Sequence, residues 1–122
     1  MLSVNNLSIS FYNNDEKTWS SAINDVSFQV QAGSVLGIVG ESGCGKTTLG
    51  RSILRLIEPT SGKILFDKQD ILELGKSKLR KLRKDIQIIF QDPYAALNPK
   101  LTVGQSILEP MQVQSVFANN LE

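Results

Sequence analysis

The stretch Gly40-Glu-Ser-Gly-Cys-Gly-Lys-Thr-Thr48 is the strongest structural signal in this sequence. It fits the phosphate-loop pattern, in which a glycine is followed by four residues and then by Gly-Lys-Thr or Gly-Lys-Ser. An apolar run, residues 34–39, precedes it, and Leu49, Ile53 and Leu56 follow at helical spacing. A strand, a glycine-rich loop and a helix in this order favour a phosphate site over a chance glycine-rich turn.

Each residue type in the loop suits an anionic ligand. Gly40, Gly43 and Gly45 permit backbone angles that turn successive N–H groups inward. These donors and the positive end of the following helix would surround phosphate groups. Lys46 supplies a mobile full charge, and Thr47 offers a hydroxyl to Mg²⁺, which prefers oxygen ligands. Together they predict a nucleotide triphosphate site.

Composition narrows the class of protein. The chain has 122 residues, about one small domain, with 41% hydrophobic and 20% charged residues and a net charge of +1. There is no histidine, which excludes imidazole-based catalysis and most zinc sites, and the single cysteine, Cys44, excludes an internal disulfide. No run is apolar and long enough for a membrane-spanning helix, and the first ten residues do not look like a secretory signal. We expect an α/β chain of the cytosol.

The apolar pattern predicts an order of elements. Strands are expected at residues 3–11, 22–30, 34–39, 63–66 and 86–90. Helices are expected at residues 46–56, 76–84 and from Thr102, where Thr102 and Gln105 fit a capping box, to Pro110, which should end or bend the helix. Polar or irregular loops are expected at residues 13–20 and 91–99.

Two segments carry a narrower resemblance. Residues 40–51 read Gly-Glu-Ser-Gly-Cys-Gly-Lys-Thr-Thr-Leu-Gly-Arg, and residues 90–99 read Phe-Gln-Asp-Pro-Tyr-Ala-Ala-Leu-Asn-Pro. Here the sequence resembles the nucleotide-binding subunit of ABC transporters, and in particular the oligopeptide, dipeptide and nickel importer branch. The resemblance extends from Leu2 to about Met111.

The resemblance implies an α/β fold of the phosphate-loop NTPase type: an antiparallel β-subdomain followed by the beginning of a parallel-sheet core. It implies ATP and Mg²⁺ as cofactors, with Gln91 as the glutamine of the Q-loop, near the metal ion and the membrane subunit. Phe11 matches the aromatic that stacks on adenine, with Tyr12 and Trp19 as alternatives. Thr47 and Gln91 would be the metal ligands. The nucleotide-binding residues implied are Phe11, Gly40, Ser42, Gly43, Cys44, Gly45, Lys46, Thr47, Thr48 and Gln91.

Other motifs of that family are absent. The sequence contains no Leu-Ser-Gly-Gly-Gln signature, no apolar run ending in Asp-Glu and no histidine. We therefore interpret residues 1–122 as the N-terminal part of the nucleotide-binding domain, which by itself holds no catalytic residue and should hydrolyse ATP negligibly. An open apolar sheet edge predicts marginal stability and self-association.

The resemblance also implies partners: membrane permease subunits and a second ABC ATPase subunit, at the cytoplasmic face of the membrane. The cargo would be peptides or, less favoured, nickel and other metal chelates. Two alternatives stay open, a small phosphate-loop kinase and an ABC-type ATPase that acts on nucleic acid or ribosomes.

Basic residues are concentrated in one run, residues 76–84. It is interpreted first as a solvated helix docked through Leu79 and Leu82, with an anionic membrane surface or nucleic acid as less favoured partners, and no nucleic acid is expected. Its six cations are Lys76, Lys78, Arg80, Lys81, Arg83 and Lys84.

Overall fold

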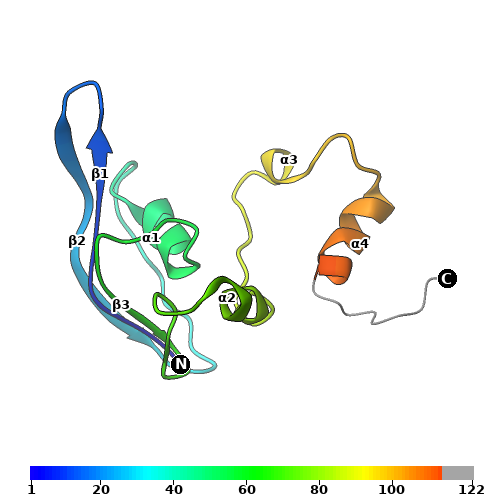
Figure 1. The fold of residues 1–122 in the computed structure, drawn as a ribbon, viewed down its shortest axis with the longest axis horizontal. Coiled ribbons are helices and arrows are strands. Elements are labelled where there is room, and N and C mark those ends of the chain that lie inside the picture. The colour runs from blue at the N-terminus through cyan, green and yellow to red at the C-terminus, as the bar shows by residue number, and fades with distance from the viewer. Residues whose placement is uncertain (114–122) are drawn as a thin grey trace. The chain divides into compact units, whose positions relative to one another are not determined.

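The computed structural model describes residues 1–113. The chain divides into two compact units, Met1–Leu79 and Arg80–Glu122. The elements in chain order are β1 (Leu2–Asn13), β2 (Thr18–Val30), α1 (Lys46–Ile53), β3 (Ser61–Phe66), β4 (Gln69–Asp70), α2 (Lys76–Leu82), α3 (Pro93–Ala96) and α4 (Val103–Val113) (Figure 1).

The first unit contains a four-stranded antiparallel sheet in the order β2-β1-β3-β4. The β1–β2 hairpin is longer than predicted, because only residues 14–17 form the turn and the predicted loop at residues 13–20 is otherwise strand. Tyr12 and Trp19 pair directly across the two strands, with ring centroids 5.3 Å apart. This aromatic cross-strand contact supports the extension of the ladder into a polar sequence.

The core lies on one face of this sheet and beneath α1. On β1 the buried side chains are Ser3, Val4, Leu7 and Ile9. Alternation between the two faces is interrupted around Asn6, and residues 11–13 are exposed. The helix α1 adds Leu49, and the segment after β4 adds Ile71 and Leu74. The buried apolar residues are Val4, Leu7, Ile9, Ile23, Leu49, Ile64, Ile71 and Leu74.

A glycine on β3 permits close strand packing at an irregularity of β1. Asn6 has a φ of 48°, and the register of β1 shifts against both neighbours around it. A Cβ on Gly62 would lie 2.6 Å from the Asn6 carbonyl oxygen and 2.6 Å from the Leu7 Cα, and the φ of Gly62 is +105°. Only glycine fits this position without moving the backbone.

Two predicted strands are wrong. Residues 34–39 and 86–90 have no strand structure, and Val35, Val39 and Ile89 are almost fully exposed. Their apolar composition predicts burial, but a strand also needs a hydrogen-bonding neighbour, and residues 1–113 pair none with either segment. Of the two predicted parts of the fold, the antiparallel β-subdomain forms a sheet within residues 1–113, whereas the segments expected to begin the parallel sheet do not.

Smaller differences concern helix ends. The helix α1 ends at Ile53 rather than near Leu56, α2 ends at Leu82, and the short helix α3 occupies part of the predicted loop at residues 91–99. Pro110 does not end α4, which continues to Val113.

The predicted capping box at the start of α4 is confirmed. The Thr102 N–H donates to Gln105 Oε1 at 2.9 Å, and the Gln105 N–H donates to Thr102 Oγ1 at 3.3 Å. The two side chains thus satisfy each other's backbone donors at the helix start.

Candidate nucleotide-binding site

The glycine-rich loop leads directly into α1, and two left-handed glycines shape it. Gly43 has a φ of +82°, and Gly45, the N-cap of α1, has a φ of +96°. Such angles cost an L-residue about 1–2 kcal/mol and cost glycine little. The loop therefore turns where the phosphate-loop pattern places its glycines.

Gly45 also seats the loop on strand β2. A Cβ at this position would lie 2.7 Å from the Ala22 carbonyl oxygen and 3.3 Å from Ile23 Cγ1. Ala22 is the extra residue of a bulge, because Ile9 pairs with Ile23 whereas the next residue, Ser10, pairs with Ser21. The loop and the sheet are thus in direct backbone contact at a position that tolerates no side chain.

The start of α1 leaves backbone donors available for an anion. No side chain caps the helix, and its first turn contains no acidic residue. Among residues 1–113, the N–H groups of Gly43, Gly45, Lys46 and Thr47 donate to no acceptor. Unpaired amides at the positive end of a helix are the donors that bind phosphate in proteins.

Lys46 folds back over the loop that precedes it. Its Nζ donates to the carbonyl oxygens of Gly40 at 2.7 Å and Glu41 at 2.5 Å, and lies 3.4 Å from Cys44 Sγ. These contacts use the three donors of the ammonium group and hold the positive charge beside the free amides. A phosphate oxygen that reaches Nζ would replace at least one of them with a stronger charge-assisted bond.

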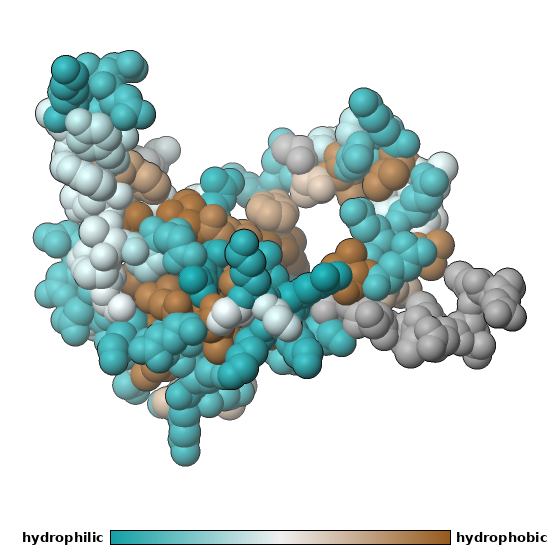
Figure 2. Space-filling view, in the orientation of Figure 1, coloured by the Kyte–Doolittle hydropathy of each residue, from teal (hydrophilic) through white to brown (hydrophobic). Residues whose placement is uncertain are grey.

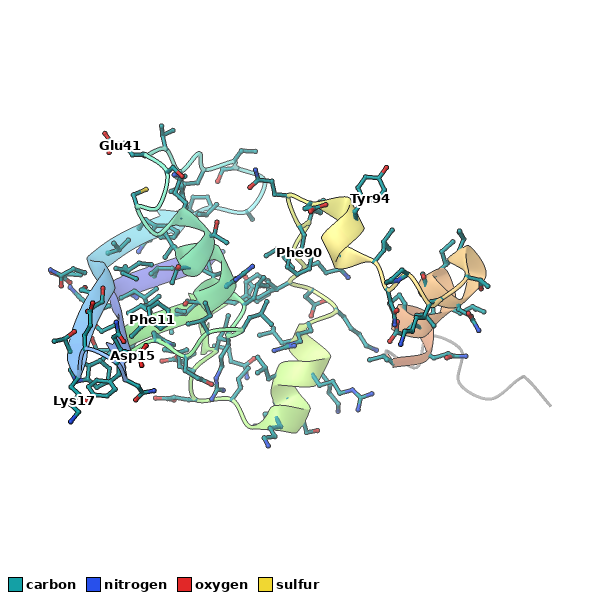
Figure 3. All side chains as sticks on the ribbon, turned by 90° about the horizontal axis from the view of Figure 1, so that it is seen from above. Phe11, Asp15, Lys17, Glu41, Phe90 and Tyr94 are labelled. Atoms are coloured by element: carbon teal, nitrogen blue, oxygen red, sulfur yellow. The ribbon has the colours of Figure 1, made fainter. Side chains whose placement is uncertain are left out.

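The remaining side chains of the loop are solvent-accessible. Ser42, Cys44 and Thr47 are exposed and Thr48 is half-buried. Figure 3 shows the Glu41 carboxylate projecting outward from the loop, so its charge does not lie among the free amides. The structure brings residues 40–48 together at the start of α1, and their part in binding a nucleotide stays a prediction.

An apolar hollow of about 290 Å³ lies beside the loop. It is bounded by β2, by the end of the apolar run before the loop and by the first turn of α1. Ile38 and Val39 line it, together with Ile23, Lys46 and Leu49. Residues 34–39 thus contact the rest of the unit near the loop although they form no strand.

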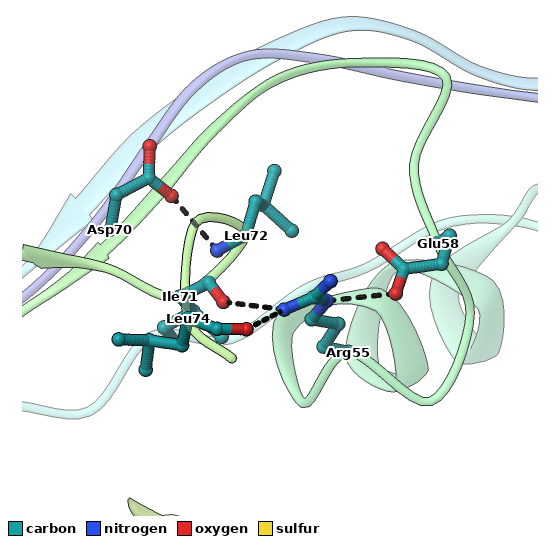
Figure 4. A network of polar contacts seen from close by, with 6 residues as sticks. All are labelled: Arg55, Glu58, Asp70, Ile71, Leu72 and Leu74. Atoms are coloured by element: carbon teal, nitrogen blue, oxygen red, sulfur yellow. Dashed lines mark hydrogen bonds and ion pairs between the residues drawn. The ribbon is translucent and has the colours of Figure 1, made fainter. Parts of the chain in front are cut away.

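The far end of α1 is fixed by an arginine that the sequence analysis did not single out. Arg55, with a φ of 51°, follows α1 and donates from Nη1 to the carbonyl oxygens of Ile71 at 3.2 Å and Leu74 at 2.6 Å. Its Nε bonds to Glu58 Oε1 at 2.8 Å, and Figure 4 shows the acceptors converging on the guanidinium group. Because these acceptors are mostly backbone atoms, the sequence carried no signal for them.

Phe11 lies on the same side of the sheet as the core. Between Leu7 and Asn13 both register shifts place the extra residue on β2, so β1 keeps its alternation and Phe11 shares a face with the buried Leu7 and Ile9. Phe11 is 44% exposed and faces Ser20 across the hairpin, next to the bulge that contacts the loop. Figure 3 shows its ring near the hairpin end.

The two alternatives to Phe11 lie on the other face of the hairpin. Tyr12 and Trp19 occupy opposed positions whose side chains point away from that of Phe11. Of the three aromatics, only Phe11 lies on the same face as Ile9 and Ile23. Gly45 of the loop packs against Ile23.

Gln91 belongs to the second unit and is exposed. It follows residues 86–90 and precedes α3, at whose start Asp92 Oδ1 accepts from the Tyr94 N–H at 2.9 Å. Its predicted approach to a metal ion stays a prediction. Among the described residues there is also no group of three or more acidic, histidine or cysteine side chains able to hold a metal ion.

This geometry is that of a glycine-rich phosphate loop at a helix start, with backbone donors and a lysine placed for an anionic ligand. The ABC transporter family model matches residues 23–122, so the chain belongs to the ABC transporter family. The predicted resemblance and fold class are thereby confirmed. The small-kinase alternative is not supported.

Similar curated proteins are named as ATP-binding proteins of peptide or oligopeptide transport. A probable peptide ABC transporter ATP-binding protein of Sinorhizobium fredii is 57% identical over 91 residues, covering 75% of this chain and 26% of that protein. The oligopeptide transport ATP-binding protein AppF of Bacillus subtilis is 53% identical, covering 79% of this chain and 30% of its own length. The chain therefore spans less than a third of either relative.

Solved structures show the same fold. A dimeric bacterial ABC transporter cassette, MJ0796, matches with a TM-score of 0.81 and 24% identity over 100% of this chain and 50% of that one. The same cassette in a post-hydrolysis state with ADP and phosphate matches with a TM-score of 0.81 and 25% identity, over 98% of this chain and 50% of that one. Within residues 1–113, no helix is both long and apolar enough to cross a bilayer.

Proposed function

We propose that this chain is the ATP-binding N-terminal part of an ABC ATPase that drives import. The observation that carries the proposal is the start of α1, where unpaired amides and the Lys46 ammonium lie together. Each hydrogen bond to a charged group contributes about 1.5–3 kcal/mol, so a few such bonds support micromolar binding after association costs. The triphosphate would occupy the loop at residues 40–48.

Phe11 is the proposed platform for the adenine ring. Its side chain lies on the face of β1 that carries Leu7 and Ile9, and its ring is half-exposed. Ser20, its partner on β2, is close in the chain to Ala22, which Gly45 contacts. Stacking would add about 0.5–1.5 kcal/mol beyond the burial of apolar area. Ser42 and Cys44 would line the phosphate site.

The loop also fits a Mg²⁺ ion that arrives with the nucleotide. The Thr47 hydroxyl is exposed at the first turn of α1, and an oxygen donor is the chemistry that Mg²⁺ prefers. The ion would neutralise phosphate charge. Thr48 would donate to the α-phosphate, and Gln91 would approach the metal from its own loop.

Peptides are the proposed cargo, because the names of the similar curated proteins specify peptide or oligopeptide transport. Metal chelates have no such support, and neither does action on nucleic acid or ribosomes. Hydrolysis would require motifs that this sequence does not contain, supplied by further sequence and by a second ATPase subunit.

A groove in the second unit is the proposed contact for a permease subunit. It has a volume of about 430 Å³ and an almost wholly apolar lining, including Tyr94, Leu97, Leu101, Val103 and Ile107. These side chains are mostly exposed, and they follow Gln91 directly in the chain. An element that senses the nucleotide would thus be adjacent in sequence to an element that contacts the membrane partner.

The test is isothermal calorimetry with ATP on the chain and two matched variants. Lys46→Ala should weaken binding beyond detection, whereas Lys63→Ala, which removes an exposed lysine on β3, should leave it unchanged. Equal affinity of the Lys46 variant and the unmodified chain would overturn the proposal.

A further inference from the structure

The helix α2 (Lys76–Leu82) and the two residues after it form the most basic surface of the chain, here named the α2 cationic surface. Six of the chain's 13 lysines and arginines lie within these nine residues, and all six are exposed. Figure 2 shows hydrophilic residues gathered over α2. Its cations are Lys76, Lys78, Arg80, Lys81, Arg83 and Lys84.

Within residues 1–113, no carboxylate forms an ion pair with this surface. The ion pairs in the part of the chain that the structure describes are Met1 with Asp67 and Arg55 with Glu58, and neither involves α2. The one side-chain hydrogen bond of the six cations within residues 1–113 runs from Arg80 Nη2 to the Val113 carbonyl oxygen at 3.1 Å. The charges are therefore available to an external anion.

Several of these charges repel one another along the helix. Lys76 and Arg80 stand four residues apart, and Lys78 and Lys81 stand three apart, so like charges are neighbours on the helix surface. Such pairs destabilise a helix. Leu79 and Leu82, one turn apart and half-buried, provide the apolar contact of α2. The six cations are exposed, and of those within the helix only Arg80 and Lys81, in its last turn, are placed to interact favourably with the helix dipole.

The chemistry of the surface fits a broad anionic plane. Four of the six cations are lysines, which are mobile point charges rather than rigid forks. Residues 76–84 contain no aromatic side chain on which a nucleic-acid base would stack, and no described cavity is lined by them. Clusters of four to eight basic residues near a bilayer bind anionic headgroups by charge alone.

We propose that the α2 cationic surface binds the anionic phospholipid headgroups of a membrane. This inference rests on the proposed function, because the ATP-binding part of an importer works beside a bilayer. Contact through α2 would hold the chain at the membrane independently of any permease. It would be weakened by salt, since exposed charges are screened at high ionic strength.

The experiment is sedimentation of the chain with phosphatidylcholine vesicles that contain or lack phosphatidylglycerol, at low and high salt. The test variant replaces by glutamine Lys76, Lys78, Lys81 and Lys84. A control variant with the same loss of charge replaces by glutamine four exposed lysines elsewhere, Lys17, Lys63, Lys68 and Lys100. Arg80 is left in place because it bonds to the chain itself.

We expect the chain to bind only the vesicles that contain phosphatidylglycerol, and to be released by salt. The α2 variant should bind at least about tenfold more weakly, and the control variant within about twofold of the unmodified chain, since each basic residue near the bilayer contributes separately. An equal loss in both variants would overturn the inference, because net charge would then explain the binding. No binding by the unmodified chain would also overturn it.

Two parallel measurements separate this inference from its alternatives. Tighter binding to duplex DNA than to the anionic vesicles would assign the surface to nucleic acid and overturn the lipid proposal. ATP affinity is measured on all three proteins. Loss of vesicle binding with ATP affinity intact supports the inference, whereas failure of the unmodified chain to bind ATP would count against the proposed function alone.

Discussion

Replacing Gly45 by alanine should disrupt the loop more than any other glycine-to-alanine change. An alanine there adopts a left-handed conformation, at a cost of about 1–2 kcal/mol. Its Cβ would also lie 2.7 Å from the Ala22 carbonyl oxygen. Because that contact is with backbone, the loop must move, and overpacking of this kind adds about 1–3 kcal/mol. We expect a loss of about 2–5 kcal/mol in the free energy of unfolding.

Movement of the loop should also misplace the free amide of residue 45. Loss of one amide bond to a charged phosphate costs about 1.5–3 kcal/mol, which corresponds to roughly 10- to 100-fold weaker ATP binding. Urea denaturation measures the stability, and calorimetry measures the affinity under conditions in which the variant is folded. The single Trp19 provides a fluorescence signal for unfolding.

Two further glycines serve as controls. A Cβ on Gly43 meets nothing within 4 Å, so no contact opposes an alanine there. Gly43→Ala should lower the free energy of unfolding by only about 1–2 kcal/mol, the cost of the left-handed conformation at φ +82°. A Cβ on Gly50, inside α1, also meets nothing, and Gly50→Ala should stabilise the helix by roughly 0.5–1 kcal/mol. If the Gly45 variant proved as stable as the Gly50 variant and bound ATP equally well, the claim that close contact between Gly45 and β2 positions the loop would be refuted.

Three other changes test the surroundings of the loop. Ser52 is fully buried and its hydroxyl has no partner among the described residues, so Ser52→Ala should raise the unfolding free energy by about 1 kcal/mol; a comparable loss would contradict this. Arg55→Ala should lower the unfolding free energy by about 2–4 kcal/mol in urea denaturation, because the carbonyls of Ile71 and Leu74 lose their donor; an unchanged midpoint would show that these hydrogen bonds do not stabilise the fold. Alkylation of Cys44, exposed beside Lys46, should block ATP binding, and bound ATP should slow the labelling; a labelling rate that ignores ATP would reject this.

The local elements could be predicted because their signals are local. The loop at residues 40–48 is specified by its own glycines and lysine, and the capping box of α4 by Thr102 and Gln105. The first strands alternate clearly between apolar and polar residues. In each case the residues that carry the signal also make the contacts.

Features that depend on distant backbone could not be predicted. Residues 34–39 have the composition of a buried strand, but pairing also requires a neighbour, which composition does not reveal. The contact of Gly45 with Ala22 depends on a bulge whose position follows from the register of two strands. The acceptors of Arg55 are carbonyl oxygens, which every residue possesses, so no side-chain pattern marks them.

The central claim is that a phosphate group binds at the start of α1, and the most direct measurement follows the backbone amides by NMR. Mg·ATP is titrated into the isotopically labelled chain, and the amide resonances are recorded at each step. We predict that the largest shifts occur at Gly43, Gly45, Lys46 and Thr47, whose N–H groups donate to no acceptor within residues 1–113. Saturable binding that leaves these four resonances unmoved and shifts others would contradict the account.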